Sequence, residues 1–86
     1  METSEHQEPT MRLLATSTSS LPTLRFGNSG EAVRVLQRLL RSNGYPVTID
    51  GLFGALTESA VKAFQTRRGL VADGIVGPLT WRELTR

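Results

Sequence analysis

The sequence predicts an all-α fold: a compact three-helix bundle formed by residues 25–86, with D-G-x-x-G loops and an internal pseudo-repeat. Two observations predict it. Three segments carry apolar residues at helical spacing, and glycine or proline residues delimit them. An eight-residue pattern also occurs twice, at the start of the second and third segments. With 86 residues, of which 38% are hydrophobic, the chain can build one small core and no second one.

The first helix is predicted to begin after Asn28 and to end at Asn43-Gly44. Asn28 and Glu31 have the spacing of a capping box, in which Asn28 accepts the Glu31 N–H and Glu31 reaches back. Gly44 ends the helix because glycine readily adopts the left-handed conformation of a helix C-terminus. The two faces of this helix are distinct: the apolar one carries Val33, Leu36, Gln37 and Leu40, and the opposite one Arg34, Arg38 and Arg41.

The second helix is predicted from Ala55 to Arg68, and the third begins at Pro78. Gly69 ends the second helix, and proline is favoured at the first helical position. Extended segments are expected at residues 45–49 and 70–72. The apolar residues are Leu56, Ala60, Val61 and Phe64 in the second helix and Leu79, Trp81 and Leu84 in the third, with Phe64 and Trp81 expected in the core.

The repeat relates Asp50–Thr57 to Asp73–Thr80 at a shift of 23 residues. Both copies follow the pattern D-G-(apolar)-(apolar)-G-x-L-T. Each aspartate is expected to accept backbone N–H groups within its own turn, and the glycine after it to supply a positive φ. The second glycine of each copy lies where the next helix starts and leaves N–H groups near the surface.

A glutamine precedes each copy of the repeat on an otherwise apolar helix face. These residues are Gln37 and Gln65. Buried polar side chains are nearly always hydrogen-bonded. We therefore expect both glutamines to bind the backbone of the D-G loops from the inside.

Residues 1–24 are predicted to form a flexible Ser/Thr-rich leader or linker. They contain nine Ser/Thr residues and a net charge of −2, whereas nine basic and five acidic side chains give residues 25–86 a net charge of +4. In residues 11–15 three apolar residues follow Arg12, which is too short an apolar run for a secretory signal. No stretch approaches the ~20 apolar residues of a membrane span. The sequence therefore predicts neither a signal peptide nor a membrane-spanning segment.

The composition excludes several kinds of catalytic site. There is no cysteine, and the single histidine, His6, lies in the predicted leader, so disulfides, thiolate zinc sites and a Ser-His-Asp triad are excluded. A glycosidase carboxylate pair could be drawn from Asp50, Asp73, Glu58 and Glu83, but both aspartates belong to repeated turns and the domain is too small for a sugar cleft. The first loop also lacks the alternating ligands of a calcium loop. We predict a non-enzymatic domain without cofactor or metal.

The arginines and the three predicted helices are also compatible with other classes of binding protein. Eight of the nine basic residues after residue 24 are arginine, which suits carboxylates and phosphates. Three helices also suggest a helix-turn-helix protein, although the predicted loops are far longer than the turn of that motif. A helical DNA-binding module is therefore one alternative, and a protein-interaction or prodomain-like module is another.

A series of motifs between Leu24 and Leu84 carries a resemblance. In order, they are Gly27-Asn28-Ser29-Gly30, Leu36-Gln37-Arg38-Leu39-Leu40, Asn43-Gly44-Tyr45, Ile49–Gly54, Ala60–Gln65, Ala72–Pro78 and Thr80-Trp81. This segment resembles the peptidoglycan-binding domain family of the PGBD-like type (peptidoglycan-binding domain 1). The resemblance implies a three-helix domain that binds bacterial cell-wall peptidoglycan, a glycan with carboxylate-rich peptide stems, without cleaving it. It also implies anchoring or targeting of a linked cell-wall hydrolase domain, and the sequence shows no such catalytic domain.

The resemblance further implies a ligand site in a shallow groove beside the first D-G loop and the helix that follows it. The candidate contacts are Tyr45, Asp50, Gly51, Phe53, Gly54 and Thr57, with Arg67 placed to meet a stem carboxylate. The implied location is the cell wall, the periplasm or the exterior, while the missing signal peptide leaves a cytoplasmic location open. We expect a monomer with no nucleic-acid partner.

Overall fold

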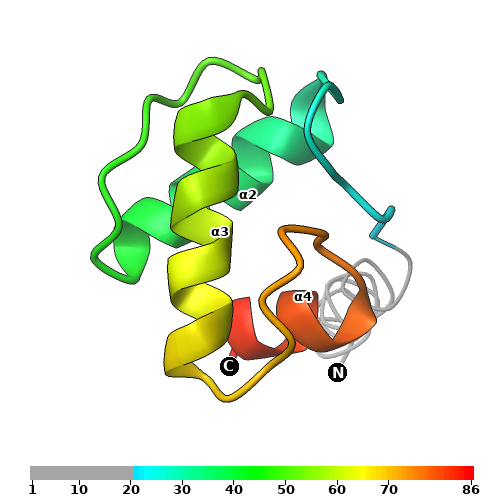
Figure 1. Ribbon diagram of the computed structural model, residues 1–86. Coiled ribbons are helices and arrows are strands. Elements are labelled where there is room, and N and C mark those ends of the chain that lie inside the picture. Colours follow the sequence, from blue (N-terminus) through cyan, green and yellow to red (C-terminus); the bar gives the residue numbers. More distant parts are fainter. Residues whose placement is uncertain (1–20) are drawn as a thin grey trace, which may run out of the picture.

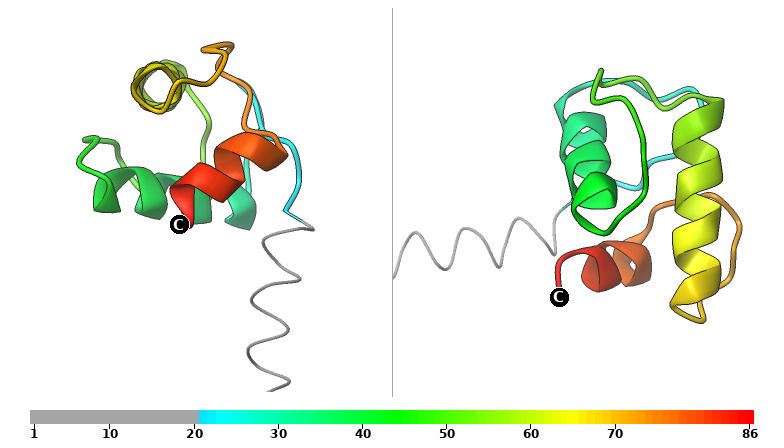
Figure 2. Two further views of the ribbon diagram at one scale, coloured as in Figure 1. Left: turned by 90° about the horizontal axis from the view of Figure 1, so that it is seen from below. Right: turned by 90° about the vertical axis from the view of Figure 1, so that its left-hand side faces the viewer.

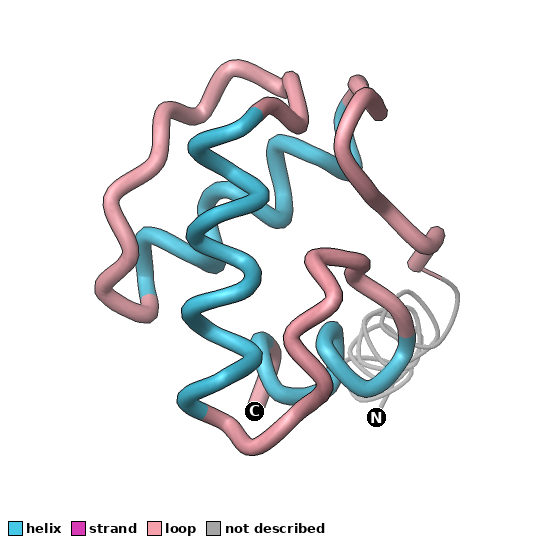
Figure 3. The backbone as a smooth tube through the Cα atoms, in the orientation of Figure 1, coloured by secondary structure: helices cyan, strands magenta, loops and turns pink. Residues whose placement is uncertain are grey.

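Three helices form the fold in the computed structural model, which describes residues 21–86 (Figure 1). They are α2 (Glu31–Ser42), α3 (Ala55–Arg67) and α4 (Pro78–Leu84). Loops connect them, and the described residues contain two isolated β-bridges but no strand (Figure 3). The all-α prediction is confirmed. No helix within residues 21–86 is long and apolar enough to cross a membrane.

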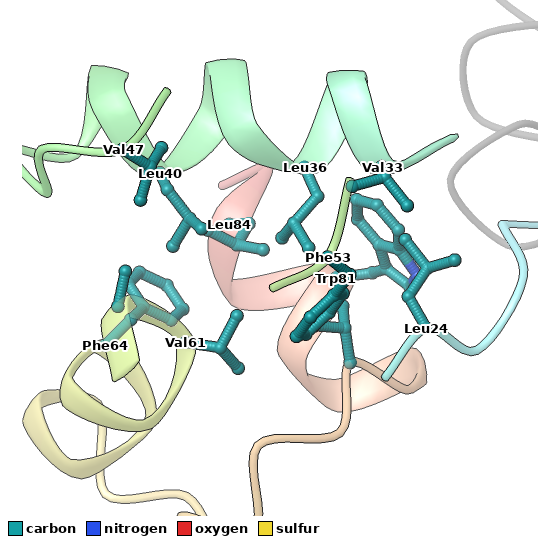
Figure 4. Packing of buried hydrophobic residues seen from close by; sticks show 12 residues of the cluster. Leu24, Val33, Leu36, Leu40, Val47, Phe53, Val61, Phe64, Trp81 and Leu84 are labelled. Atoms are coloured by element: carbon teal, nitrogen blue, oxygen red, sulfur yellow. The ribbon is translucent and has the colours of Figure 1, made fainter. Parts of the chain in front are cut away.

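The core lies between α3 and the pair formed by α2 and α4, which occupy the same side of α3 (Figure 2). Phe64 and Trp81 are buried, with 0% and 1% of their surface exposed, as predicted. Figure 4 shows the α2 side chains pointing toward both other helices. The main members of the cluster are Val33, Leu36 and Leu40 of α2, Val61 and Phe64 of α3, and Trp81 and Leu84 of α4.

The start of α2 differs from the predicted capping box. Gly30 is the N-cap residue, with φ 125°, and no side chain caps the helix. The Asn28 carboxamide oxygen instead accepts the Arg25 N–H at 3.0 Å. Asn28 is held away from the helix end because its carbonyl accepts the Phe53 N–H at 2.9 Å. The non-local pairing of this segment therefore overrides the local capping signal.

The buried face of α3 differs from the predicted one at its first position. Leu56 is 58% exposed, whereas Thr57 is 3% exposed and lies on the inner face. Ala60, Val61 and Phe64 are buried as expected. The predicted place of Leu56 on the apolar face of this helix is wrong, because Thr57 faces inward to meet the Gln37 side chain.

Residues 21–24, which the sequence placed in the leader, pack against the helical domain. Leu24 is 5% exposed and pairs with Val76 through backbone hydrogen bonds of 3.0 and 2.8 Å. The Trp81 indole N–H donates to the Pro22 carbonyl at 2.9 Å. The folded unit therefore extends to residue 21. The rest of the predicted flexible leader, residues 1–20, lies outside the described residues.

Candidate functional site

The first D-G loop is built around the buried side chain of Gln37, which is 0% exposed. Its amide oxygen accepts the N–H groups of Asp50 and Gly51 at 3.0 and 2.9 Å. Its amide nitrogen lies 3.0 Å from the Asp50 carboxylate, 3.0 Å from the Leu52 carbonyl and 3.1 Å from the Thr57 hydroxyl. The predicted role of Gln37 is confirmed, since one side chain joins the turn to the first turn of α3.

Gln65 repeats this arrangement in the second D-G loop. Its amide nitrogen donates to the Asp73 carboxylate, the Ile75 carbonyl and the Thr80 hydroxyl at 3.2, 2.9 and 3.1 Å. Its amide oxygen accepts the Gly74 N–H at 3.0 Å. The second network differs by one bond, because the N–H of Asp73 makes no hydrogen bond to Gln65. The sequence repeat is therefore a repeat of hydrogen-bonded geometry.

Asp50 caps its own turn and is held in its ionised form. Its carboxylate accepts the Leu52 N–H at 2.9 Å as well as the Gln37 amide. The Leu52 N–H bond, followed by the bond from Gln37, lowers the pKa of Asp50 below its ordinary value of 3.8. The charge of nearby Arg34 acts in the same direction. Asp50 is thus a fixed negative charge at the surface and a poor general acid at neutral pH.

A shallow groove, which we call the first groove, lies beside this loop and has a volume of about 250 Å³. Its lining joins the loop to the first turn of α3, and its walls carry the exposed side chains of Leu52 (59%) and Leu56 (58%). A neighbouring hollow of about 300 Å³ shares Thr48 and Leu56 with it and brings in Arg41. The lining residues of the first groove are Thr48, Asp50, Leu52, Gly54, Ala55, Leu56 and Thr57.

Of the residues predicted for the site, Asp50, Gly54 and Thr57 line the first groove. Gly51 is adjacent but buried, and its φ of 78° confirms the predicted left-handed turn. A Cβ atom there would lie 3.3 Å from the Gly30 carbonyl oxygen, so the position favours glycine.

Three of the predicted contacts lie elsewhere. Phe53 is 2% exposed and belongs to the core, so its ring offers a ligand no surface. Tyr45 is half-buried, with its ring edge-on to Phe64 at 5.9 Å between centroids. Arg67 is exposed in the last turn of α3, twelve residues after Ala55. This spacing corresponds to about 18 Å along the helix axis from the first groove.

The sequence reasoning missed the two leucines that form the groove walls. Leu52 and Phe53 are adjacent apolar residues, and the pattern did not distinguish which of them points inward. The repeat did hold a signal for Leu56. Its equivalent in the second copy, Leu79, is 60% exposed, so the leucine of the D-G-x-x-G-x-L-T pattern faces outward twice.

The basic face of α2 borders this site. Glu31 lies 3.7 Å from Arg34 and 3.9 Å from Arg38, and these are exposed, loosely paired groups. Arg41, one turn further along, lines the neighbouring hollow next to Leu56. A ligand in the first groove would therefore meet the fixed Asp50 carboxylate, and one that extends into the neighbouring hollow would also meet the Arg41 guanidinium.

Several known proteins are similar to this chain in sequence and in fold. The family model described as a peptidoglycan binding domain matches residues 29–84. The zinc D-Ala-D-Ala carboxypeptidase of Streptomyces albus G is 52% identical over 67 residues, covering 72% of this chain and 26% of that enzyme. A peptidoglycan-binding protein from Clostridioides difficile, solved in complex with glutamine hydroxamate, superposes with a TM-score of 0.75 at 48% identity, covering 77% of this chain and 42% of that one.

A further solved structure matches at nearly full length. The SleB N-terminal domain superposes with a TM-score of 0.73 at 40% identity, covering 77% of this chain and 92% of that domain. By contrast, this chain spans about a quarter of the length of the carboxypeptidase. Relatives named as enzymes thus carry this module beside other parts. The family match covers most of the three-helix unit, and the chain belongs to the peptidoglycan-binding domain family.

Proposed function

We propose that this chain binds bacterial cell-wall peptidoglycan without cleaving it and serves as an anchoring module. Its membership of the peptidoglycan-binding domain family carries this proposal. The similar segment is 26% of a carboxypeptidase and 21% of an N-acetylmuramoyl-L-alanine amidase from Bacillus licheniformis. A shared module of this size, attached to different chemistries, supports a role in placing an enzyme on its polymer.

The first groove is the proposed ligand site. It is open and shallow, and it combines two exposed leucines with the Asp50 carboxylate and the inward-facing Thr57. Arg41 stands at its edge and is proposed to meet a carboxylate of a peptide stem. In this proposal Arg41 takes the role that the sequence gave to Arg67, because Arg41 borders the groove.

The proposed action is binding alone. Asp50 and Asp73 each accept a backbone N–H two residues ahead and a glutamine amide, so both carboxylates have structural roles in their turns. The groove is also too open to exclude water from a reacting sugar. We propose that the chain is a monomer, works in the cell wall or outside the cell, and acts beside a linked hydrolase domain.

The test is co-sedimentation of the full chain with insoluble peptidoglycan sacculi, with cellulose and duplex DNA as parallel controls. We expect binding to sacculi, and weak affinity per domain because a shallow site buries little area. Retention on DNA but not on sacculi would overturn the proposal and favour the nucleic-acid alternative.

A pair of matched variants locates the site. Leu56→Ser changes a groove wall that is 58% exposed, and Phe26→Ser changes a side chain that is 57% exposed and lines neither groove region. Leu56→Ser should weaken sedimentation with sacculi, while Phe26→Ser should leave it unchanged. Equal binding by both variants, each with the melting temperature of the parent, would place the site elsewhere.

A further inference from the structure

The second D-G loop has a groove of its own, which we call the second groove. Its volume is about 290 Å³, close to that of the first groove, and it is formed by the equivalent positions of the repeat together with the segment after α3. The pairs Asp50 and Asp73, Gly54 and Gly77, and Thr57 and Thr80 recur in the two linings. The two hydrogen-bonded scaffolds therefore each present a groove at their outer side.

Exposed apolar side chains gather at these two places. Five large hydrophobic residues are exposed among the described residues, and four of them line a groove. Leu52 and Leu56 line the first groove, and Val71 (79%) and Leu79 (60%) line the second. Exposed apolar surface that is concentrated in a concave site indicates ligand binding more than chance exposure does.

The second groove is lined by more large aliphatic side chains than the first groove. Its walls are formed by Leu70, Val71, Ile75, Pro78 and Leu79, whereas the large aliphatic side chains of the first groove are Leu52 and Leu56. The Asp73 carboxylate lines it and, within residues 21–86, forms no ion pair. Lys62 and Glu58 both lie over Gly74, with the Lys62 Cε and the Glu58 Cγ 3.1 and 3.2 Å from where a Cβ would stand. An aliphatic slot with a negative charge suits a short peptide that bears an ammonium group.

We propose that the second groove binds a peptide stem of peptidoglycan that carries a free side-chain amine. The alanine methyl groups and the methylene chain of such a stem match the aliphatic walls, and its ammonium group pairs with Asp73. This inference rests on the proposed function, because it assigns a second contact to the same polymer. The first groove then keeps the role of the main site.

The position of the second groove allows both contacts on one domain. The first groove is lined by Thr57 in the first turn of α3, and the second by Gln65 in its last turns. Eight residues separate these two positions. They correspond to about 12 Å along the helix axis, so neighbouring parts of one polymer can reach both ends of α3. Two weak contacts on one linked ligand raise the apparent affinity above that of either contact.

The test is a titration of the full chain, followed by amide chemical shifts, with the stem tetrapeptide L-Ala-γ-D-Glu-L-Lys-D-Ala. The same peptide acetylated on its lysine amine is the matched control. We expect the free-amine peptide to shift the amides of Val71, Asp73 and Leu79, and acetylation to weaken binding about two- to fivefold, as for an exposed ion pair. Shifts confined to the first groove, or equal binding of the two peptides, would overturn the proposal.

Two variants separate charge from shape. In Asp73→Asn the side-chain oxygen still accepts the Gln65 and Ile75 bonds, so the loop is retained while the charge is removed. This variant should bind both peptides as weakly as the parent binds the acetylated one. Leu79→Ser should weaken the binding of both peptides. Phe26→Ser is the control for the loss of an exposed apolar residue. If Asp73→Asn still distinguishes the two peptides, the ammonium group does not lie at Asp73.

The remaining outcomes separate this inference from the proposed function. If the parent does not sediment with sacculi, the proposed function fails. Only this inference fails if the parent sediments, Leu56→Ser weakens that sedimentation, and the peptide does not shift the amide signals of the second groove. Sedimentation velocity over a range of concentrations adds a third arm. Self-association that Leu79→Ser abolishes would show that a second copy fills the groove, and would overturn the stem assignment.

Discussion

Replacing Gln37 with methionine tests whether the buried amide holds the first loop. Methionine keeps the unbranched length of the side chain and removes its donors and acceptor. Two of the bonds that are lost are fully buried, those to the Gly51 N–H and to the Thr57 hydroxyl. A buried polar group left without a partner costs about 1–3 kcal/mol, so Gln37→Met should lower the free energy of unfolding by about 2–6 kcal/mol. The other three bonds are partly exposed, and water can replace them.

Gln65→Met should cost a similar amount, because that side chain also makes two fully buried bonds, with Gly74 and Thr80. A domain of this size has a total stability of about 3–10 kcal/mol, so either variant loses a large share of it. The assay is urea unfolding followed by the fluorescence of Trp81, which is the single tryptophan and is 1% exposed. Arg38→Met, on the exposed face of α2, controls for a methionine in the helix. A loss below about 1 kcal/mol in both glutamine variants would refute the reasoning.

Three further predictions concern the loop and the core. Gly51→Ala should lower the free energy of unfolding by about 1–2 kcal/mol, because φ is 78° and the new Cβ would lie 3.3 Å from the Gly30 carbonyl oxygen. Gly54→Ala, at φ −105° with open space around it, should change the urea midpoint little. The pKa of Asp50 is lower in the folded chain, so the unfolded chain binds more protons in acid. The contribution of Asp50 is complete above its ordinary pKa and is lost as pH falls through the folded value. Urea midpoints from pH 7 to pH 3 should therefore fall more for the parent than for Asp50→Asn. Phe64→Ala should lower the free energy of unfolding by about 3–5 kcal/mol, since Phe64 is fully buried, and an unchanged melting temperature would contradict its core position.

The repeated scaffold could be predicted from sequence because its signals are local or strongly constrained. An Asp-Gly pair defines a turn within a few residues, and a glutamine on an apolar helix face must find partners inside the molecule. The repeated pattern therefore predicted that Asp50 and Asp73 stabilise their turns and that Gln37 and Gln65 bind the loop backbone from inside. The hydrogen bonds of the structure confirm both predictions. The family resemblance then supplied the ligand class, which the turns alone did not indicate.

The orientation of single apolar residues could not be predicted in the same way. Leu56 and Thr57 are adjacent, and the helical pattern favoured the leucine for the core because it is the more apolar. The structure turns Thr57 inward because its hydroxyl meets the Gln37 amide at 3.1 Å. That contact joins residues twenty positions apart. The helical period therefore predicted Ala60, Val61 and Phe64 correctly and failed only in the first turn, which lines the first groove.

The burial of Phe53 was also missed, because it depends on the segment that precedes α2. Gly27 donates to the Phe53 carbonyl, and Phe53 donates to the Asn28 carbonyl, each at 2.9 Å. This antiparallel pairing fixes the loop so that Phe53 is 2% exposed while its neighbour Leu52 is 59% exposed. No pattern within the loop indicates which residue the pairing turns inward, because the partner lies about 25 residues earlier in the chain.

The same segment explains why both copies of the repeat expose the same side. Leu24 pairs with Val76 in the second loop, as residues 27–30 pair with the first. The fourth residue of each copy is thereby buried, Phe53 at 2% and Val76 at 0%, while the third lines a groove. One stretch of chain thus covers the inner edges of both loops and leaves their outer sides facing solvent. The two grooves therefore share a scaffold and differ in their surroundings. A ligand that distinguishes them must do so through side chains such as Val71, which lines the second groove, and Arg41, which lines the hollow beside the first.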